Sequence, residues 1–235
     1  MRLNQFIASC GVCSRREADK LIAGGKITVN GEIPSAGMQV NEQDEVIYNG
    51  KKLSLLQNKV VLAYYKEVGI VCTEKDKHAK RTVIDEISYP QRVTYAGRLD
   101  KDSEGLMLLS NDGNLINSMM KSINNHEKEY VVLVDKEIDD DFIKKMSEGV
   151  YLKDLGRTTR ACRVTKKSKN SFYIVLTQGL NRQIRRMCES LGYNVVSLKR
   201  IRIMSVELDE LGLKPGEYVE LGSDIIKKLY AECGL

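Results

Sequence analysis

Tryptophan is absent from this chain, and its 235 residues include only three prolines and two histidines, His78 and His126. Two histidines leave little material for a histidine-rich metal centre or a Ser-His-Asp triad. Neither the phosphate-binding pattern G-x-x-x-x-G-K-[ST] nor the dinucleotide pattern G-x-G-x-x-G occurs, so a nucleotide cofactor has no recognisable binding loop. Any chemistry must therefore rely on carboxylates, tyrosine, lysine and arginine, and we expect no cofactor.

Long apolar segments are missing as well. The longest uninterrupted apolar run, residues 60–65, is far shorter than the roughly 20 residues that cross a bilayer. Residues 1–16 contain no sustained apolar stretch of the kind that a secretory signal needs. Of the six cysteines only Cys10 and Cys13 lie close together, and a single C-x2-C favours free thiols over a zinc site. We expect a soluble, cytoplasmic protein without a metal or a membrane partner.

Basic residues are present in excess and are unevenly distributed. The net charge is +5, and residues 153–202 hold 13 Lys or Arg against two acids. Residues 1–30 hold five basic and two acidic side chains. Two concentrated positive regions suit a polyanion, most simply nucleic acid, although a solvated lysine-rich surface has the same composition. The length fits one large domain or two smaller ones, at about 100–200 residues per domain.

The first 50 residues show the local signals of a small helix-helix-strand unit. Leu3, Phe6 and Ile7 have helical spacing, and a second short helix follows a capping box formed by Ser14 and Glu17. Asn-Gly pairs at 30–31 and 49–50 predict tight turns beside the strand-like segments 27–29 and 45–48. The second helix presents one basic face, formed by Arg15, Arg16 and Lys20. We therefore predict a binding domain over residues 1–50 and a linker over 51–58.

Residues 59–235 show paired strands rather than a regular alternation of strands and helices. The strand candidates are 60–65, 106–109, 129–135, 158–165, 171–177, 195–204 and 217–221, and the helix candidates are 82–88, 112–121, 139–148, 181–191 and 223–232. This order predicts an α+β domain built on a mainly antiparallel mixed sheet.

Arginine is concentrated on the predicted helix 181–191 and on the strand after it. Apolar residues of the helix follow an i, i+3, i+4, i+7 pattern, which leaves Arg182, Arg185 and Arg186 on other positions. In the strand, alternation predicts that Arg200 and Arg202 share one face. Helix and strand together predict a positively charged surface.

The segment 97–105 is a polar, glycine-containing turn immediately before an apolar strand. It presents Asp100, Asp102 and Glu104 beside Arg98 and Lys101. A carboxylate in such a loop can serve as a nucleophile, a general base or a metal ligand. From the pattern alone, a surface turn with charge pairs is the favoured interpretation.

Three motifs in this chain resemble those of a known enzyme family. GRLDKDSEGL (97–106) is similar to the catalytic motif of the small-subunit rRNA pseudouridine synthases of type A, and Lys128-Glu129-Tyr130 and GLNRQIRRMCE (179–189) resemble their second and third motifs. RLNQFIASCGVCSRREADKLIAGGKITVNGE (2–32) resembles an S4 RNA-binding domain. The residues of the third motif are most similar to those of the large-subunit synthase F branch. Many relatives have a basic residue where this chain has Leu180.

The resemblance implies a function and a set of site residues. Asp100 matches the essential aspartate, Tyr130 lies against the target base, and Arg185 pairs with the aspartate. The implied activity is the isomerisation of a uridine in structured ribosomal RNA, most simply 23S rRNA, with tRNA as a further possible substrate. The enzyme is expected to act as a monomer. The residues expected to bind RNA are Arg15, Arg16, Lys20, Arg98, Lys101, Arg182, Arg186, Arg200 and Arg202.

Two other functions remain open at this stage. One is a non-catalytic RNA-binding or ribosome-assembly protein, against which the complete set of Asp100, Tyr130 and Arg185 argues. The other is a Mg²⁺-dependent nuclease that uses Asp100 and Asp102, which predicts activity that EDTA abolishes.

Overall fold

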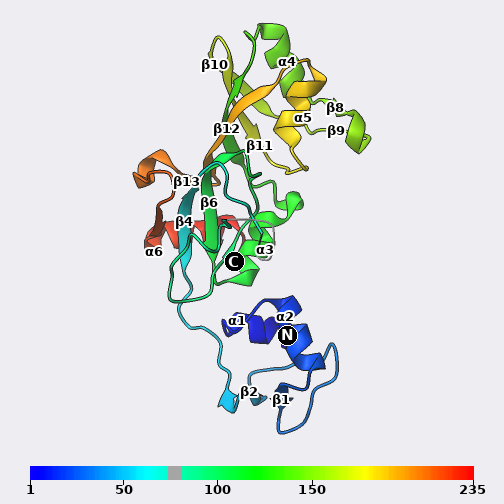
Figure 1. Cartoon of the computed structure of the whole chain (residues 1–235), viewed down its shortest axis with the longest axis vertical. Helices are drawn as coiled ribbons and strands as arrows, with labels where there is room; N and C mark the ends of the chain where they lie inside the picture. The colour runs from blue at the N-terminus through cyan, green and yellow to red at the C-terminus, as the bar shows by residue number, and fades with distance from the viewer. Residues whose placement is uncertain (74–80) are drawn as a thin grey trace. The chain divides into compact units, whose positions relative to one another are not determined.

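The computed structural model describes residues 1–73 and 81–235. The chain divides into two compact units (Figure 1). The first comprises Met1–Val60, Tyr89–Thr94 and Ser110–Gly113, and the second comprises Val61–Ser88, Tyr95–Leu109 and Asn114–Leu235. His78 lies outside the described residues. Within the described ranges, no helix is long and apolar enough to cross a membrane.

The first unit packs two helices against a small antiparallel sheet. Its elements are α1 (Leu3–Ser9), α2 (Arg15–Ala23), β1 (Ile27–Val29), β2 (Val46–Tyr48) and β3 (Lys51–Lys52), with strand order β1-β2-β3. The Ser14 hydroxyl accepts a hydrogen bond from the Glu17 amide at 3.2 Å, as the capping box predicts. Leu3, Ile7 and Ile27 lie at the centre of the unit's core.

The two predicted Asn-Gly turns are present, but only one of them joins paired strands. Asn49 and Gly50 have φ of 50° and 73° and connect β2 to β3. Asn30 and Gly31 also have positive φ, yet their turn bridges only Val29 and Glu32. The partner of β1 is β2, which comes after a long loop.

The second unit is built on a nine-stranded mixed sheet. Its main strand order is β10-β11-β7-β12-β6-β4-β14, and two short strands, β5 and β13, pair with β6 and β12. The pairing of β12 with β6 is parallel. The pairings β10–β11, β11–β7, β12–β7, β12–β13 and β14–β4 are antiparallel. The strands are β4 (Val61–Lys66), β5 (Thr94–Tyr95), β6 (Glu104–Ser110), β7 (Lys128–Val134), β10 (Arg163–Ser168), β11 (Ser171–Leu176), β12 (Val195–Ile203), β13 (Val206–Glu207) and β14 (Tyr218–Glu220). This arrangement confirms the predicted α+β fold with a mainly antiparallel mixed sheet.

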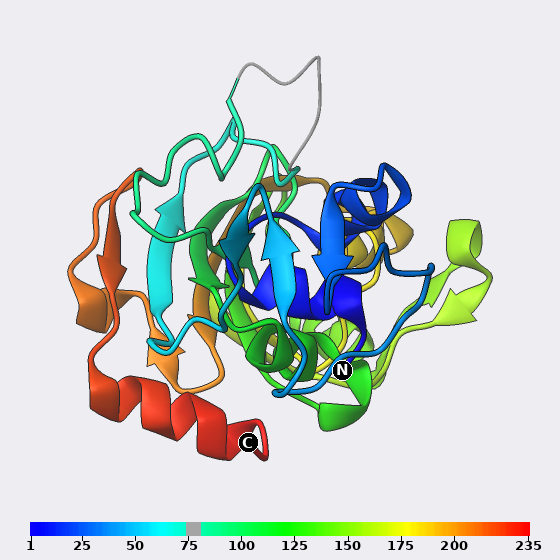
Figure 2. The ribbon, with the colours of Figure 1, turned by 90° about the horizontal axis from the view of Figure 1, so that it is seen from below.

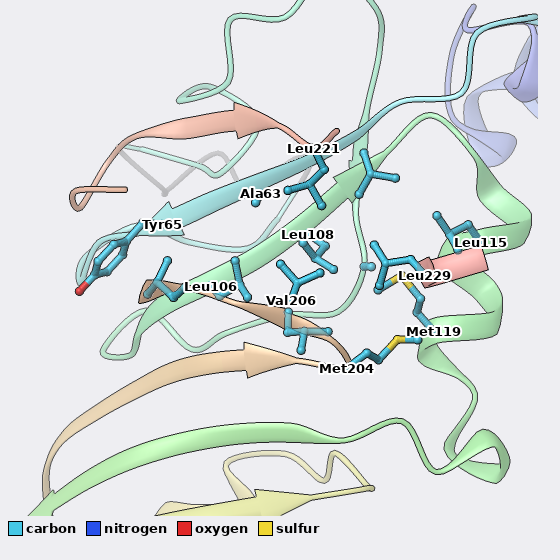
Figure 3. Close-up of a cluster of buried hydrophobic side chains, with 14 residues drawn as sticks. Ala63, Tyr65, Leu106, Leu108, Leu115, Met119, Met204, Val206, Leu221 and Leu229 are labelled. Carbon is cyan, nitrogen blue, oxygen red and sulfur yellow. The ribbon is translucent and has the colours of Figure 1, made fainter. Parts of the chain in front are cut away.

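Helices pack on the sheet to form two apolar cores. The helices are α3 (Gly113–Met120), α4 (Asp140–Glu148), α5 (Gln183–Ser190) and α6 (Ser223–Glu232). One core joins side chains of β4, β6 and β13 to α3 and α6, with Leu106, Leu108, Leu115 and Leu229 fully buried (Figure 3). The other joins β7, β11 and β12 to α4 and α5. Seen from below, β14 lies beside β4, and α6 follows β14 (Figure 2).

The predicted helix at 82–88 is wrong, because these residues form only a single turn. Backbone hydrogen bonds join Val71 to Arg81 and Val83 to Val71, so the segment is tied to another part of the chain. The Thr82 hydroxyl donates to Asp85 at 2.7 Å, a local bond that competes with continuation of a helix. Pro90 follows and disfavours helical backbone before it.

The predicted strand at 158–165 is also wrong, because two separate strands occupy that region. β9 (Arg157–Thr158) pairs with β8 (Tyr151–Leu152) outside the main sheet, and β10 begins only at Arg163. Between them, the Thr159 amide donates to Val150 O and the Cys162 amide to Ser147 O. These long-range bonds turn the chain away from the strand that its local pattern predicts.

Candidate active site

A cavity of about 500 Å³ opens within the second unit at the N-terminal end of β6. Its walls come from the loop 97–103, from β7, from the segment 176–185 and from β12. The cavity brings together Asp100, Tyr130 and Arg185, the three residues expected to be catalytic. Among the described residues that line it, Asp100 is the single carboxylate, and there are seven cations: Arg98, Lys101, Lys121, Lys128, Arg182, Arg185 and Arg200.

Asp100 lies in a loop whose backbone is held on several sides. Just before it, the Leu99 amide donates to the buried Cys72 Sγ at 3.4 Å. Just after it, the Ser103 amide donates back to Asp100 O at 3.1 Å and closes a turn. A carboxylate placed this way has a restricted position relative to the cavity, as a reacting group requires.

Three buried cations also hold carbonyl groups of the segment that follows Asp100. Arg185 Nη2 donates to Asp102 O at 2.8 Å, Lys66 Nζ to Ser103 O at 2.7 Å, and Arg200 Nε to Leu106 O at 2.7 Å. The three side chains come from α5, β4 and β12, elements that are distant in sequence. Charge-assisted hydrogen bonds of this kind are stronger than neutral ones, so the loop is fixed to the sheet by the fold around it.

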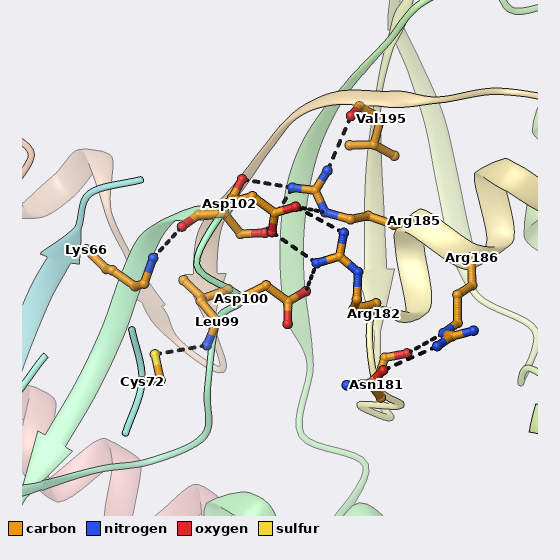
Figure 4. A network of polar contacts seen from close by, with 11 residues as sticks. Lys66, Cys72, Leu99, Asp100, Asp102, Asn181, Arg182, Arg185, Arg186 and Val195 are labelled. Carbon is orange, nitrogen blue, oxygen red and sulfur yellow. Dashed lines mark hydrogen bonds and ion pairs between the residues drawn. The ribbon is translucent and has the colours of Figure 1, made fainter. Parts of the chain in front are cut away.

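The ion pair with Asp100 is made by Arg182, not by Arg185 as the resemblance implies. Arg182 Nη1 lies 3.7 Å from Asp100 Oδ2, and the same guanidinium contacts both carboxylate oxygens of Asp102 at 3.2 and 3.0 Å (Figure 4). The Arg185 Nε lies 3.4 Å from Asp102 Oδ2, and its other nitrogens bind Val195 O and Ser103 Oγ at 3.2 Å each. Arg185 therefore acts on the loop that carries Asp100 and not on the carboxylate of Asp100.

Arg182 reaches both carboxylates because the chain turns sharply before α5. Arg182 has a left-handed backbone with φ of 50°, and α5 starts at Gln183, later than the predicted start at 181. Burial alone would raise the pKa of Asp102, but the hydrogen bonds of Arg182 and the charges of Arg185 and Arg182 hold this pKa below its usual value. Asp102 is therefore an anion at neutral pH and keeps Arg182 beside Asp100.

Tyr130 and Arg200 face each other across the sheet beside this loop. They are direct partners in the antiparallel pairing of β7 and β12, and both line the cavity. On its other side, Arg200 pairs with Gly105 of β6, where a Cβ would lie only 2.2 Å from Arg200 O. Gly105 also has φ of 110°. Glycine at this position thus permits the close approach that places Arg200 at the cavity.

The expected shared face of Arg200 and Arg202 is wrong. A β-bulge between them shifts the register, so that Arg200 pairs with Tyr130 but Arg202 pairs with Glu129, which points to the opposite face of β7. Arg200 is only 1% exposed. Arg202 forms ion pairs with Glu127 and Glu129 at 2.8 Å each. The alternation that predicted one arginine-lined face is interrupted by one residue.

The other residues expected to bind RNA lie in three places. Arg98 and Lys101 are exposed at the cavity. Arg186 lies outside the lining set and binds Asp154 and Asn181. Arg15, Arg16 and Lys20 are exposed on α2 of the first unit.

Sequence reasoning missed Lys66, Ser103 and Lys128 as parts of the site. Lys66 is fully buried, and burial lowers its pKa. A lysine that directly follows the apolar run 60–65 was the one available signal, since a charged end to a buried strand needs a partner. Ser103 and Lys128 lie within two of the quoted motifs, but the resemblance assigned no role to either side chain. Among residues 1–73 and 81–235, no group of three or more His, Cys, Asp or Glu could hold a metal ion.

Comparison with known proteins agrees with these features over nearly the whole chain. Residues 60–190 match the family described as RNA pseudouridylate synthase, and residues 1–46 match the S4 domain. The dual-specificity RNA pseudouridine synthase RluF of Escherichia coli (strain K12) is 44% identical over 232 residues, which cover 98% of this chain and 78% of that protein. The ribosomal large subunit pseudouridine synthase B of Bacillus subtilis (strain 168) is 35% identical over 237 residues, or 98% of this chain and 96% of the relative.

A solved structure supports the same relationship. A crystal structure of a pseudouridylate synthase aligns with a TM-score of 0.72 and 29% sequence identity, and the alignment covers 97% of this chain and 99% of that one. With the matching family segment, the similar relatives and the shared fold, this chain belongs to the RNA pseudouridine synthase family and carries an S4 domain at its N-terminal end.

Proposed function

We propose that this protein converts a uridine of structured ribosomal RNA to pseudouridine in the cavity around Asp100. The observation that carries this proposal is the lining of the cavity, where one carboxylate and one tyrosine face a pocket surrounded by seven cations. Ligand cavities commonly measure about 300–1,000 Å³, so a volume of about 500 Å³ accommodates a nucleotide. The cations suit a substrate that brings phosphates with it.

The reaction needs no change in atomic composition. The N-glycosidic bond of the uridine breaks, the uracil turns over, and a C–C bond forms from C5 to the anomeric carbon. C5 then loses its proton, and N1 ends with a hydrogen. An isomerisation of this kind consumes no oxidant, reductant or energy source. The chemistry therefore falls to side chains that can stabilise charge and move a proton.

Asp100 is the proposed catalytic residue. Its carboxylate either attacks the anomeric carbon as a nucleophile or accepts a proton from the sugar on a glycal route. Arg182, whose Nη1 lies 3.7 Å from Asp100 Oδ2, restricts the orientation of this carboxylate. Tyr130 offers a ring on which the extruded uracil can stack and a hydroxyl that can take part in removing the C5 proton.

The substrate is proposed from the names of the relatives. RluF is named a dual-specificity RNA pseudouridine synthase, and the Bacillus subtilis relative is named a ribosomal large subunit pseudouridine synthase. We propose 23S rRNA as the substrate of this chain and tRNA as the second candidate. We further propose that the protein works as a monomer in the cytoplasm and that residues 1–50 hold the RNA.

The direct test is tritium release from unmodified 23S rRNA labelled at C5 of its uridines. With RNA folded in monovalent salt, the protein should release the tritium of one uridine per RNA molecule. The same amount should be released in the presence of EDTA. A Mg²⁺-dependent nuclease would produce fragments and stop in EDTA. A non-catalytic binding protein would bind the RNA without any release, and either result would refute the proposed activity.

The basic face of α2 should contribute to RNA binding through phosphate contacts. Replacement of Arg15, Arg16 and Lys20 by alanine should weaken binding and lower the slope of log affinity against log salt by up to about 2–3, because each lost phosphate contact removes roughly 0.7–0.9 from it. Filter binding at several salt concentrations measures both quantities. The matched control removes three exposed lysines from other helices, Lys144, Lys227 and Lys228. Equal effects of the two triple variants would show that only net charge matters.

A further inference from the structure

Residues that line the cavity carry buried N–H donors without a hydrogen-bond partner. Across the described part of the chain, four buried side-chain nitrogen or oxygen atoms lack a hydrogen-bond partner: Tyr64 Oη, Gln178 Nε2, Arg185 Nε and Arg200 Nη2. The last three belong to residues that line this cavity, and all three are N–H donors. Buried donors are rarely left unpaired, because their desolvation is then uncompensated. The cavity is thus built for a ligand that supplies acceptors.

Among these three residues, Arg200 differs in carrying a charge with which no carboxylate of the described residues forms an ion pair. Gln178 is neutral, and Arg185 lies beside the carboxylate of Asp102. The guanidinium of Arg200 is 1% exposed, and its Nε is bound to a neutral carbonyl, Leu106 O. Its strand is paired with β6 on one side and β7 on the other, and Gly105 packs directly against the backbone of Arg200. Arg200 is a fixed, buried cation without a counter-ion among the described residues.

A second cation lies on the neighbouring strand. Lys128 and Tyr130 are two residues apart on β7, so both side chains are on the same face, and Tyr130 is the direct partner of Arg200. Within the described part of the chain, Lys128 Nζ bonds only to the carbonyl of His126, at 3.3 Å. Burial, followed by the charge of Arg200, lowers the pKa of Lys128. The two cations therefore affect each other, and no described carboxylate forms an ion pair with either.

We propose that Lys128 and Arg200 form an anion subsite that takes a phosphodiester of the substrate RNA next to the target uridine. This inference rests on the proposed function and adds a specific contact to it. A phosphodiester has only acceptors and one negative charge, and arginine with lysine is a common pair for binding it. A neutral uracil carbonyl could satisfy Arg200 Nη2 but would leave the charges of the buried Arg200 and the partly buried Lys128 unbalanced. Because the subsite adjoins Tyr130, the bound phosphate flanks the extruded nucleotide.

The test replaces single phosphodiesters of the RNA by uncharged methylphosphonates. The linkages on the two sides of the target uridine are replaced one at a time, and single-turnover rate at subsaturating RNA is measured together with affinity. On unmodified RNA, Lys128→Met should lower the rate by about 10-fold to 100-fold, the range for a lost bond to a charged group. On RNA with the contacted linkage neutralised, the same variant should be within about threefold of wild type, because its partner is already missing.

Two further variants make the outcome decisive. Arg200→Lys keeps the charge of a buried position but removes the guanidinium fork. Like Lys128→Met, it should lose rate on unmodified RNA and lose little on RNA with the contacted linkage neutralised. Thermal unfolding checks that this variant is folded. Lys144→Met, on the exposed surface of α4, is the matched lysine control and should behave like wild type on every RNA. Equal losses for Lys128→Met on charged and neutralised RNA at both linkages would overturn the subsite. Failure of the wild type to release tritium from any RNA would instead overturn the proposed function.

Discussion

Asp100→Asn is expected to abolish pseudouridine formation while leaving RNA affinity close to that of the wild type. Asparagine keeps the shape of the side chain but cannot act as a nucleophile or accept a proton. Loss of a residue on which the reaction depends lowers rates by at least about a thousandfold. The affinity should change little, because the seven cations of the cavity and the basic face of α2 remain. Single-turnover tritium release and filter binding measure the two quantities separately.

The matched control for this prediction is Asp102→Asn. Asp102 lies in the same loop and binds the same guanidinium, that of Arg182, but it does not line the cavity. We expect it to retain activity within about tenfold of wild type, since it only orients a neighbour. Substantial activity in Asp100→Asn, or equal losses in the two variants, would contradict the assignment of Asp100 as the catalytic residue.

Arg185→Lys is expected to lower the catalytic rate about 100-fold, with a much smaller change in RNA affinity. The guanidinium joins Val195 of β12 to Asp102 and Ser103 of the Asp100 loop. A lysine ammonium cannot span these acceptors, because it lacks the planar fork. The loop should then shift, and small displacements of a reacting group cost about 100-fold in rate. The resemblance implies that Arg185 pairs with Asp100, and the ammonium of a lysine at this position could keep such a pair. The observed contacts of Arg185 predict instead that Arg185→Lys retains little catalytic activity.

Arg186→Lys supplies the comparison, since it changes the next residue of the same helix. Arg186 binds Asp154 and Asn181 and lies outside the lining of the cavity. Its rate at saturating RNA should equal that of the wild type. Arg185→Lys should also lose about 3 kcal/mol of unfolding free energy, as expected for lost hydrogen bonds to a buried charged group. If excess RNA restored the rate of Arg185→Lys to that of Arg186→Lys, Arg185 would be a phosphate contact and not a positioning residue.

Local sequence signals determined most of the secondary structure of this protein. Helix α4 spans Asp140–Glu148 with Asp139 as its cap, and α6 spans Ser223–Glu232, close to the predicted ranges. The capping serine of α2 and the Asn-Gly turn after β2 are likewise present as predicted. Such features depend on residues within a few positions of each other, so the order of residues alone specifies them. The polar turn that carries Asp100, placed just before an apolar strand, belongs to the same class.

Only the tertiary structure decided which charged groups meet. Arg182 and Asp102 are 80 residues apart in sequence, and their contact depends on a left-handed backbone at Arg182 that helical periodicity does not reveal. Arg200 is buried beside Tyr130 because a bulge shifts the pairing of β12 with β7 and because Gly105 admits the neighbouring backbone. A one-residue shift of register moves a side chain to the other face of a sheet. The pairing of distant strands, and not the local pattern of residues, therefore determined how the arginines are arranged around Asp100.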